Sequence, residues 1–164
     1  MSHKIATFLM QGQDWNGEQD PTGWIISEKL DGFRAYWDGS SFLSKNGKSF
    51  SVPSEFTSKL PSNVCLDGEL WLGYGEFSTL FSIFIKTYNL QGDSQKLELW
   101  KDVKYCVFDA PKHPGYYLER HAFASATISS CGNNVIMIPV EECLGMGHLQ
   151  TKLEKITEKK GEGI

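Results

Sequence analysis

The sequence has no surplus of basic residues: 16 lysines and arginines stand against 20 aspartates and glutamates, giving a net charge of −4. A protein that grips duplex nucleic acid through many phosphates usually carries a basic surplus. Any contact with nucleic acid must therefore be local, or must come from a part of the protein outside this chain. The acidity still leaves room for a nucleotide site, which needs only a few well-placed cations.

The spacings of cysteine and histidine that hold zinc are also absent. No two of the four cysteines form a CxxC pair, and the four histidines show no HxxxH spacing. This argues against a zinc site and favours reduced, structural thiols in an intracellular protein. The four cysteines are Cys65, Cys106, Cys131 and Cys143.

Long apolar runs are missing as well. The run at residues 5–10 is too short for the core of a signal peptide, and no stretch approaches the roughly 20 apolar residues that span a membrane. We therefore expect an intracellular protein without membrane attachment. The cytoplasm, the nucleus and an organelle all remain open as its compartment.

What is present predicts one domain over residues 1–164, because 40% of the residues are hydrophobic and no repeat or linker divides the chain. The tight-turn dipeptides Asp38-Gly39 and Asn46-Gly47 bracket a short strand. The expected strands are 24–29, 33–37 as its antiparallel partner, 42–44, 64–71, 103–108 and 134–140, and the expected helices are 77–86, 119–129 and 147–160. The pattern predicts an α+β fold built on antiparallel sheets.

The chemistry is concentrated in the segment SEKLDGFR at residues 27–34. On a strand, alternation would place Ser27, Lys29 and Asp31 on one face. A lysine is a nucleophile only when it is deprotonated, and the pKa of a free lysine is about 10.4. The site would have to lower that pKa by burial or by nearby positive charge. From spacing alone, a surface salt bridge near a hairpin turn is the simpler interpretation.

Four motifs in order change that interpretation. The hexapeptide KLDGFR, which begins at Lys29, resembles the Lys-x-Asp-Gly-x-Arg signature of the covalent nucleotidyltransferases: DNA ligases, RNA ligases and mRNA-capping guanylyltransferases. LDGEL at residues 66–70 resembles the third motif of that family, YCVFD at residues 105–109 resembles the next, and the pair Glu162-Gly163 resembles the fourth. Taken singly, the last three could be a turn into a strand, a buried core strand and an ordinary tail carboxylate.

The sequence around the lysine is similar to that of the small, minimal ATP-dependent DNA ligases. This resemblance extends over nearly all of residues 22–164. Two further positions bear on the subfamily. NAD-dependent ligases normally have an arginine where this chain has Asp67, and the family usually has an arginine where this chain has Lys45. A lysine keeps the charge but loses the planar fork of arginine, which weakens the expectation that Lys45 grips phosphate.

The resemblance implies a nucleotidyltransferase (ATP-grasp-like) adenylation domain of antiparallel sheets flanked by helices. It also implies that this chain is incomplete at its C-terminus, since family members continue with a fifth motif containing two lysines and then an OB-type barrel. On that basis we expect an unpaired sheet edge, and a chain that is inactive or binds nucleotide poorly on its own. The fifth-motif lysines would stabilise the transferring phosphoryl group.

The implied activity is that of an ATP-dependent DNA ligase that uses ATP and Mg²⁺ (or Mn²⁺), acts on nicked duplex DNA and works as a monomer. A lysyl-AMP intermediate would form, pass AMP to a 5′-phosphate and end in sealing by the 3′-hydroxyl. The resemblance implies that Lys29 is the nucleophile, that Asp31 positions this lysine or the metal, and that Arg34 contacts the phosphate end of the nucleotide. It also implies that Lys45 contacts the nucleotide and that Glu69 contacts the ribose. Phe108 would stack on the base, and Glu162 would bind the metal. Alternatives are an RNA ligase, a capping-type nucleotidyltransferase or a non-catalytic nucleotide-binding fragment.

Overall fold

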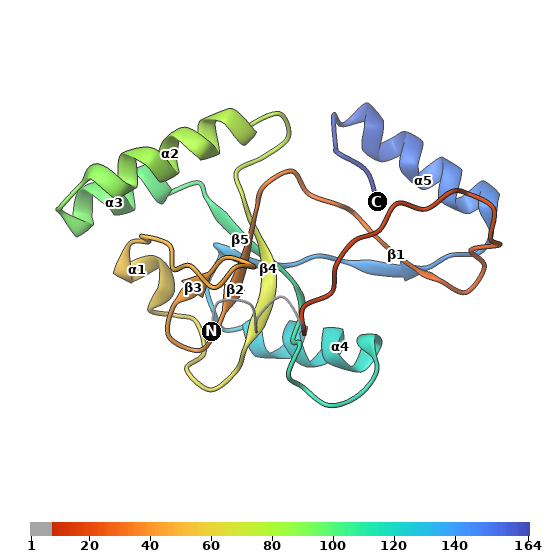
Figure 1. Ribbon diagram of the computed structural model, residues 1–164, viewed down its shortest axis with the longest axis horizontal. Helices are drawn as coiled ribbons and strands as arrows, with labels where there is room; N and C mark the ends of the chain where they lie inside the picture. Colours follow the sequence, from red (N-terminus) through yellow and green to blue (C-terminus); the bar gives the residue numbers. More distant parts are fainter. Residues whose placement is uncertain (1–7) are drawn as a thin grey trace.

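The computed structural model describes residues 8–164, so the first part of the apolar run at residues 5–10 lies outside the described residues. Two sheets carry the fold, one of five strands and one of two (Figure 1). The strands are β1 (Ile25–Ser27), β2 (Phe33–Trp37), β3 (Phe42–Leu43), β4 (Leu66–Trp71), β5 (Lys104–Asp109), β6 (Val135–Met137) and β7 (Val140–Glu142). The helices are α1 (Ser54–Thr57), α2 (Phe77–Asn89), α3 (Asp93–Trp100), α4 (Tyr117–Ile128) and α5 (Met146–Glu158). This confirms the predicted mixed fold with mostly antiparallel sheets.

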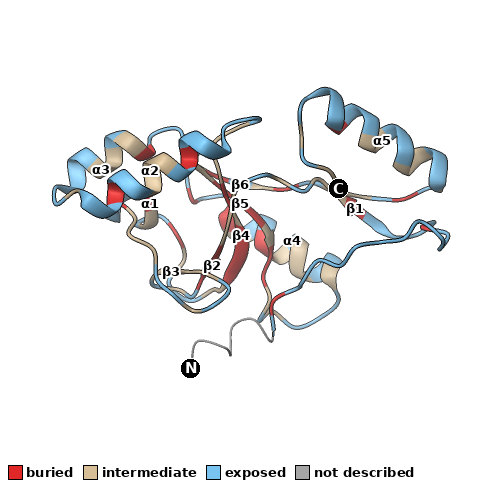
Figure 2. Cartoon of the chain, turned by 45° about the horizontal axis from the view of Figure 1, so that its top comes forward, coloured by how far each residue is buried: buried red, intermediate tan, exposed pale blue. Residues whose placement is uncertain are grey.

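The larger sheet has the strand order β3-β2-β4-β5-β6. Its neighbours are antiparallel except β5 and β6, which run parallel because the crossover helix α4 joins them. The buried residues gather along its central strands (Figure 2), and the core continues into α1, α2 and α3 through Phe56, Leu80 and Trp100. The indole of Trp100 is fully buried and donates its N–H to the Thr87 hydroxyl at 2.7 Å, so the core leaves that donor satisfied.

The predicted hairpin of residues 24–29 with 33–37 is wrong. Strand β1 ends at Ser27 and pairs with β7 in the two-stranded sheet, whereas β2 pairs with β3 and β4. The chain crosses between the sheets at Gly32, where a Cβ atom would lie 2.1 Å from the carbonyl oxygen of Leu70. Only glycine allows the backbone to pass so close over β4, and this crossing prevents a local hairpin.

The predicted strand 134–140 is also two strands in different sheets. Its first half is β6 of the larger sheet, and its second half is β7, the partner of β1. Pro139 lies in the break between them and has no N–H with which to continue a ladder. Helices α1 and α3 were not expected, while the remaining predicted elements are present with bounds shifted by a few residues. No described helix is long and apolar enough to span a membrane.

Candidate active site

A cavity of about 1050 Å³ lies between the two sheets. All seven residues singled out by the sequence line it, although they come from the larger sheet, the segment between β1 and β2, the turn after β3 and the C-terminal segment: Lys29, Asp31, Arg34, Lys45, Glu69, Phe108 and Glu162. The structure therefore brings together residues separated by up to 133 positions in the sequence.

Lys29 lies just after β1, where the backbone leaves the smaller sheet. Its N–H donates to the carbonyl oxygen of Gly163 at 2.9 Å, and its side-chain ammonium contacts the carboxylate of Glu162. The Lys29 side chain is 64% exposed, so ligand could reach it directly. Ser27, Lys29 and Asp31 all line this cavity, as the predicted alternation requires. The Glu28 carboxylate accepts a hydrogen bond from the Tyr74 hydroxyl at 2.8 Å, and Ile26, Glu28 and Leu30 line a separate hollow with Tyr74 that neither Lys29 nor Asp31 lines.

The guanidinium of Arg34 is held in place by the buried carboxylate of Asp67. It donates two hydrogen bonds to Asp67, with Nε–Oδ1 at 3.0 Å and Nη2–Oδ2 at 2.5 Å. Burial raises the pKa of Asp67, a neighbouring carboxylate at Asp109 raises it further, and Arg34 opposes both effects. The guanidinium also lies 5.1 Å from the centre of the Phe108 ring. The pair thus orients a positive charge on the cavity wall beside an aromatic ring.

Glu69 faces Arg34 across the β2–β4 ladder. Burial raises the pKa of Glu69 to about 7, although Arg34 lowers it and Glu162 raises it. A carboxyl group with this pKa exchanges its proton near neutral pH, so its hydrogen-bonding role with a ligand hydroxyl depends on pH.

Lys45 reaches the cavity from the tight turn after β3. Gly47 donates its N–H to the carbonyl oxygen of Ser44 at 2.8 Å, and Ser44 donates its N–H to the carbonyl oxygen of Lys48 at 2.8 Å. The turn at Asn46-Gly47 predicted from the sequence is confirmed, and it presents Lys45 on the same cavity as Lys29.

The lining residues that the sequence reasoning missed include residues 10–12, Phe50, Tyr117 and Ile138. Tyr117 begins α4 and donates its hydroxyl to the carbonyl oxygen of Phe108 at 2.7 Å. None of these residues belongs to a recognisable motif. The tyrosine that opens a helix directly after a Pro-Gly loop is the one signal that the sequence offered for Tyr117.

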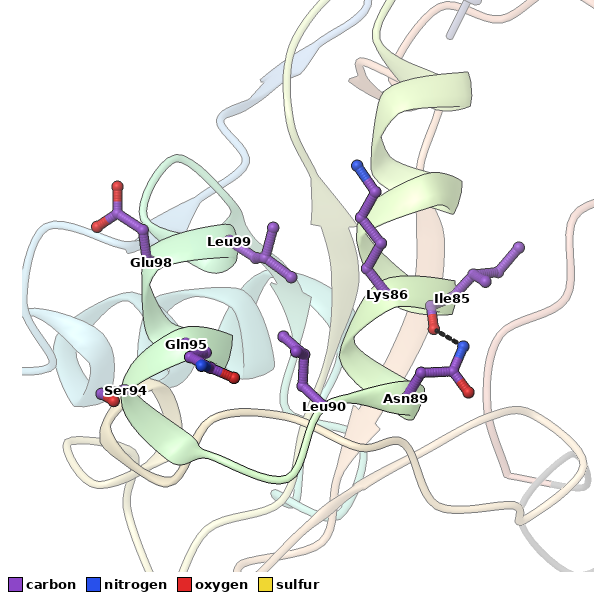
Figure 3. A pocket seen from close by; sticks show the side chains of 8 residues that line it. All are labelled: Ile85, Lys86, Asn89, Leu90, Ser94, Gln95, Glu98 and Leu99. Atoms are coloured by element: carbon purple, nitrogen blue, oxygen red, sulfur yellow. Dashed lines mark hydrogen bonds between the residues drawn. The ribbon is translucent and has the colours of Figure 1, made fainter.

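A second hollow, of about 660 Å³, lies between α2 and α3. Figure 3 shows its lining, in which Leu90 follows the end of α2, Leu99 lies on α3, and the Asn89 side chain donates to the carbonyl oxygen of Ile85 at 3.1 Å. None of the sequence-predicted site residues lies there. The candidate chemistry therefore belongs to the cavity between the sheets.

The carboxylates of that cavity fit a divalent cation only in a limited way. Asp31 and Glu162 line the same space, yet residues 8–164 contain no group of three acidic, histidine or cysteine side chains able to hold a metal ion by themselves. Mg²⁺ typically uses one or two carboxylates together with substrate phosphates and water. The donor set fits a cation that arrives with a phosphorylated ligand.

Comparison with known proteins places this geometry in context. No family model matches the chain. It is 33% identical over 146 residues to a DNA ligase of Haemophilus influenzae, an alignment that covers 87% of this chain and 50% of that protein. The chain thus spans about half the length of the curated relative that it matches.

Solved structures of DNA ligases are also similar to this chain. A structure from a study of Lig E DNA ligases is 27% identical, with a TM-score of 0.76, and covers 89% of this chain and 55% of that one. The Chlorella virus DNA ligase-adenylate is 16% identical, with a TM-score of 0.60, and covers 94% of this chain and 56% of its own. The chain therefore has the fold of the DNA ligase structures that it matches, and it aligns with about half the length of each.

Proposed function

We propose that this chain is the adenylation portion of an ATP-dependent DNA ligase and that it carries AMP on Lys29. The Lys29 nitrogen, once deprotonated, attacks the α-phosphorus of ATP, so that a nitrogen–phosphorus bond forms and the bond to pyrophosphate breaks. In the whole protein, AMP then moves to the 5′-phosphate of a nick in duplex DNA, and the adjacent 3′-hydroxyl displaces it. The observation that carries this proposal is the convergence of Lys29, Arg34, Glu69 and Phe108 on one cavity.

Each side chain has a role that its position supports. Phe108 offers a ring face for the purine, and Arg34, held at 3.0 and 2.5 Å by Asp67, offers a fixed cation beside it. Glu69 lies one strand from Arg34 and accepts from the ribose hydroxyls when it is ionised. Positioning of this kind lowers the barrier because the reacting groups are already in place.

Asp31 and Glu162 are the carboxylates proposed to hold Mg²⁺ or Mn²⁺. Such an ion, when bound, neutralises charge on the leaving pyrophosphate. Glu162 also contacts the Lys29 ammonium, so this ion pair has to separate when the nucleotide binds. Lys45, from the turn opposite, is proposed to contact the nucleotide through its charge.

We further propose that the whole protein acts as a monomer inside the cell, where ATP and nicked DNA occur together. Nick sealing is a step common to DNA replication, repair and recombination, and the proposed reaction belongs to that step. A carboxylate at Asp67 supports ATP rather than NAD as the nucleotide, because NAD-dependent ligases normally have arginine there.

The direct test is the intact mass of the chain after incubation with Mg²⁺ and ATP, with GTP and NAD in parallel. The proposal predicts the mass of one AMP added with ATP and no adduct with GTP or NAD. A GMP adduct from GTP would instead favour a capping-type enzyme. No adduct with any nucleotide, either on this chain or on the whole protein, contradicts the proposed chemistry and favours a non-catalytic nucleotide-binding fragment.

The nucleic-acid substrate needs a second assay, in which the AMP-loaded chain is mixed with 5′-phosphorylated nicks in DNA or in RNA duplexes. A DNA ligase should transfer AMP to the DNA nick and leave the RNA nick unmodified. Preferential transfer to RNA would favour the RNA ligase alternative.

A further inference from the structure

One side of helix α4 is polar although it faces the protein. Tyr117, Arg120 and His121 are spaced three and four residues apart, so they lie on the same side of the helix. Tyr117 and His121 bond to the carbonyl oxygens of Phe108 and Ile138, which line the candidate nucleotide cavity, and Arg120 bonds to Asp109, the residue after Phe108. A helix face needed only for packing would be apolar.

The bond from Tyr117 meets an irregularity in the larger sheet. In the β4–β5 ladder, Asp67 pairs with Asp109 and Gly68 pairs with Val107, so Phe108 has no partner on β4. An extra residue of this kind loses its ladder hydrogen bonds, and a bulge redirects its side chain. The Tyr117 hydroxyl donates to the Phe108 carbonyl oxygen at 2.7 Å and so supplies a replacement partner.

Arg120 stabilises the same bulge through Asp109, the residue that follows Phe108. Asp109 is 1% exposed, and Arg120 donates to its two oxygens at 2.9 and 3.4 Å. Arg120 also donates to the carbonyl oxygen of Gly115 at 3.2 Å and lies 5.6 Å from the centre of the Tyr117 ring. The ion pair therefore holds the start of α4, and with it Tyr117, against the end of β5.

His121 completes the set one turn after Tyr117. Its Nε2 donates to the carbonyl oxygen of Ile138 at 2.8 Å, and the N–H of Ile138 donates to Val107 at 2.8 Å. Ile138 and Phe108 both line the cavity. Two backbone carbonyls on one wall are thus fixed by two side chains of one helix.

We infer that α4 is a positioning element of the nucleotide pocket, in which Tyr117 fixes the bulge that aims the Phe108 ring at the base. This inference rests on the proposed function, because it takes the base as the ligand of Phe108. Tyr117 is a positioning residue that acts through Phe108. Its hydroxyl is occupied by the Phe108 carbonyl oxygen and does not serve the phosphates.

The test is a double-mutant cycle on ATP affinity, measured by equilibrium dialysis without Mg²⁺ so that transfer to Lys29 does not enter. Tyr117→Phe removes only the hydroxyl and should weaken ATP binding about five- to tenfold, the effect of losing one partly buried hydrogen bond. In a Phe108→Leu chain the same substitution should change the affinity less than twofold, because the ring that it aims is gone. Tyr116→Phe, at the neighbouring tyrosine that is 84% exposed, is the matched control and should have no effect.

Circular dichroism of each variant checks that the fold is retained, and Tyr117→Trp provides a second replacement lacking the hydroxyl. Equal losses from Tyr117→Phe in the two backgrounds would overturn the inference, as would unchanged affinity in the single variant. ATP binding without any AMP adduct contradicts the proposed chemistry while leaving the cycle measurable. A failure of the unaltered chain to bind ATP overturns both.

Discussion

Arg34 and Asp67 form a two-point ion pair between the first and third motifs, with one partner on the cavity wall and the other in the core. The Asp67 side chain is fully buried, whereas that of Arg34 is 24% exposed. Two parallel hydrogen bonds fix the plane of the guanidinium, which a lysine ammonium would not do. The pair therefore links the stability of the sheet to the orientation of a cation in the site.

Breaking this pair should be costly for folding. Arg34→Leu leaves the Asp67 carboxylate buried without a partner, and we expect the free energy of unfolding to fall by about 3–5 kcal/mol. Urea denaturation measures the change. Lys101→Gln, which removes an exposed ion pair with Glu98, should leave the stability unchanged within error. Equal effects of the two substitutions would contradict the role given to Asp67.

The glycine of the third motif should be required for steric reasons. A Cβ on Gly68 would lie 2.5 Å from the carbonyl oxygen of Cys106 and 2.8 Å from the ring of Tyr105. Gly68→Ala should therefore lower the free energy of unfolding by about 1–3 kcal/mol or prevent folding. Gly147→Ala, in α5 with nothing within 4 Å of the added atom, should be neutral or stabilising by up to about 1 kcal/mol. Comparable losses in the two variants would show that the close approach at Gly68 is not the cause.

Glu69 should give the stability a specific pH dependence. Its pKa is raised from 4.5 to about 7, first by burial and also by Glu162. Its stabilising contribution is therefore complete below pH 4.5 and is lost as the pH rises through about 7. The stability of Glu69→Gln relative to the unaltered chain should grow over that window, by up to about 3 kcal/mol, and stay constant above it. Urea titrations at several pH values test this, with the exposed Glu18→Gln as the control expected to show no such trend.

A single substitution just after the end of α5 should increase the stability of the protein. Lys160 has φ 64°, a left-handed conformation that suits glycine. It stands in a helix-ending turn, where Gly161 donates to the carbonyl oxygen of Ile156 and Lys160 donates to that of Thr157, both at 2.9 Å. Lys160→Gly should raise the free energy of unfolding by about 0.5–1 kcal/mol.

The neighbouring Lys159 has φ −81°, which a lysine adopts without strain. Lys159→Gly should accordingly lower the melting temperature while Lys160→Gly raises it. A lower melting temperature for Lys160→Gly would contradict the account of this turn.

The sequence predicted the strands best where local signals agreed. The strand 33–37 has the bounds of β2, and the Asn46-Gly47 turn follows β3 as expected. Pairing failed at residues 24–29, because the decisive contact is the passage of Gly32 over the Leu70 carbonyl, and no local pattern encodes such a contact. Helices α1 and α3 are held by tertiary packing of Phe56 and Trp100 rather than by strong helical periodicity.

The candidate site was predictable where residues belong to motifs. Lys29, Glu69 and Phe108 were found in this way, and they line one cavity. Tyr117 could not be found because its part depends on a bulge in β5 that only the pairing register reveals. The direct ion pair of Lys29 with Glu162 was likewise unforeseen, since a motif names residues but does not fix their contacts in the absence of a ligand.

The central claim is that Lys29 receives AMP, and peptide mapping after incubation with Mg²⁺ and ATP tests it most directly. The account predicts AMP on the peptide that contains Lys29, no AMP in a Lys29→Arg chain and normal loading in a Lys48→Arg chain. AMP on a different lysine, or an adduct that persists in the Lys29→Arg chain, would contradict it.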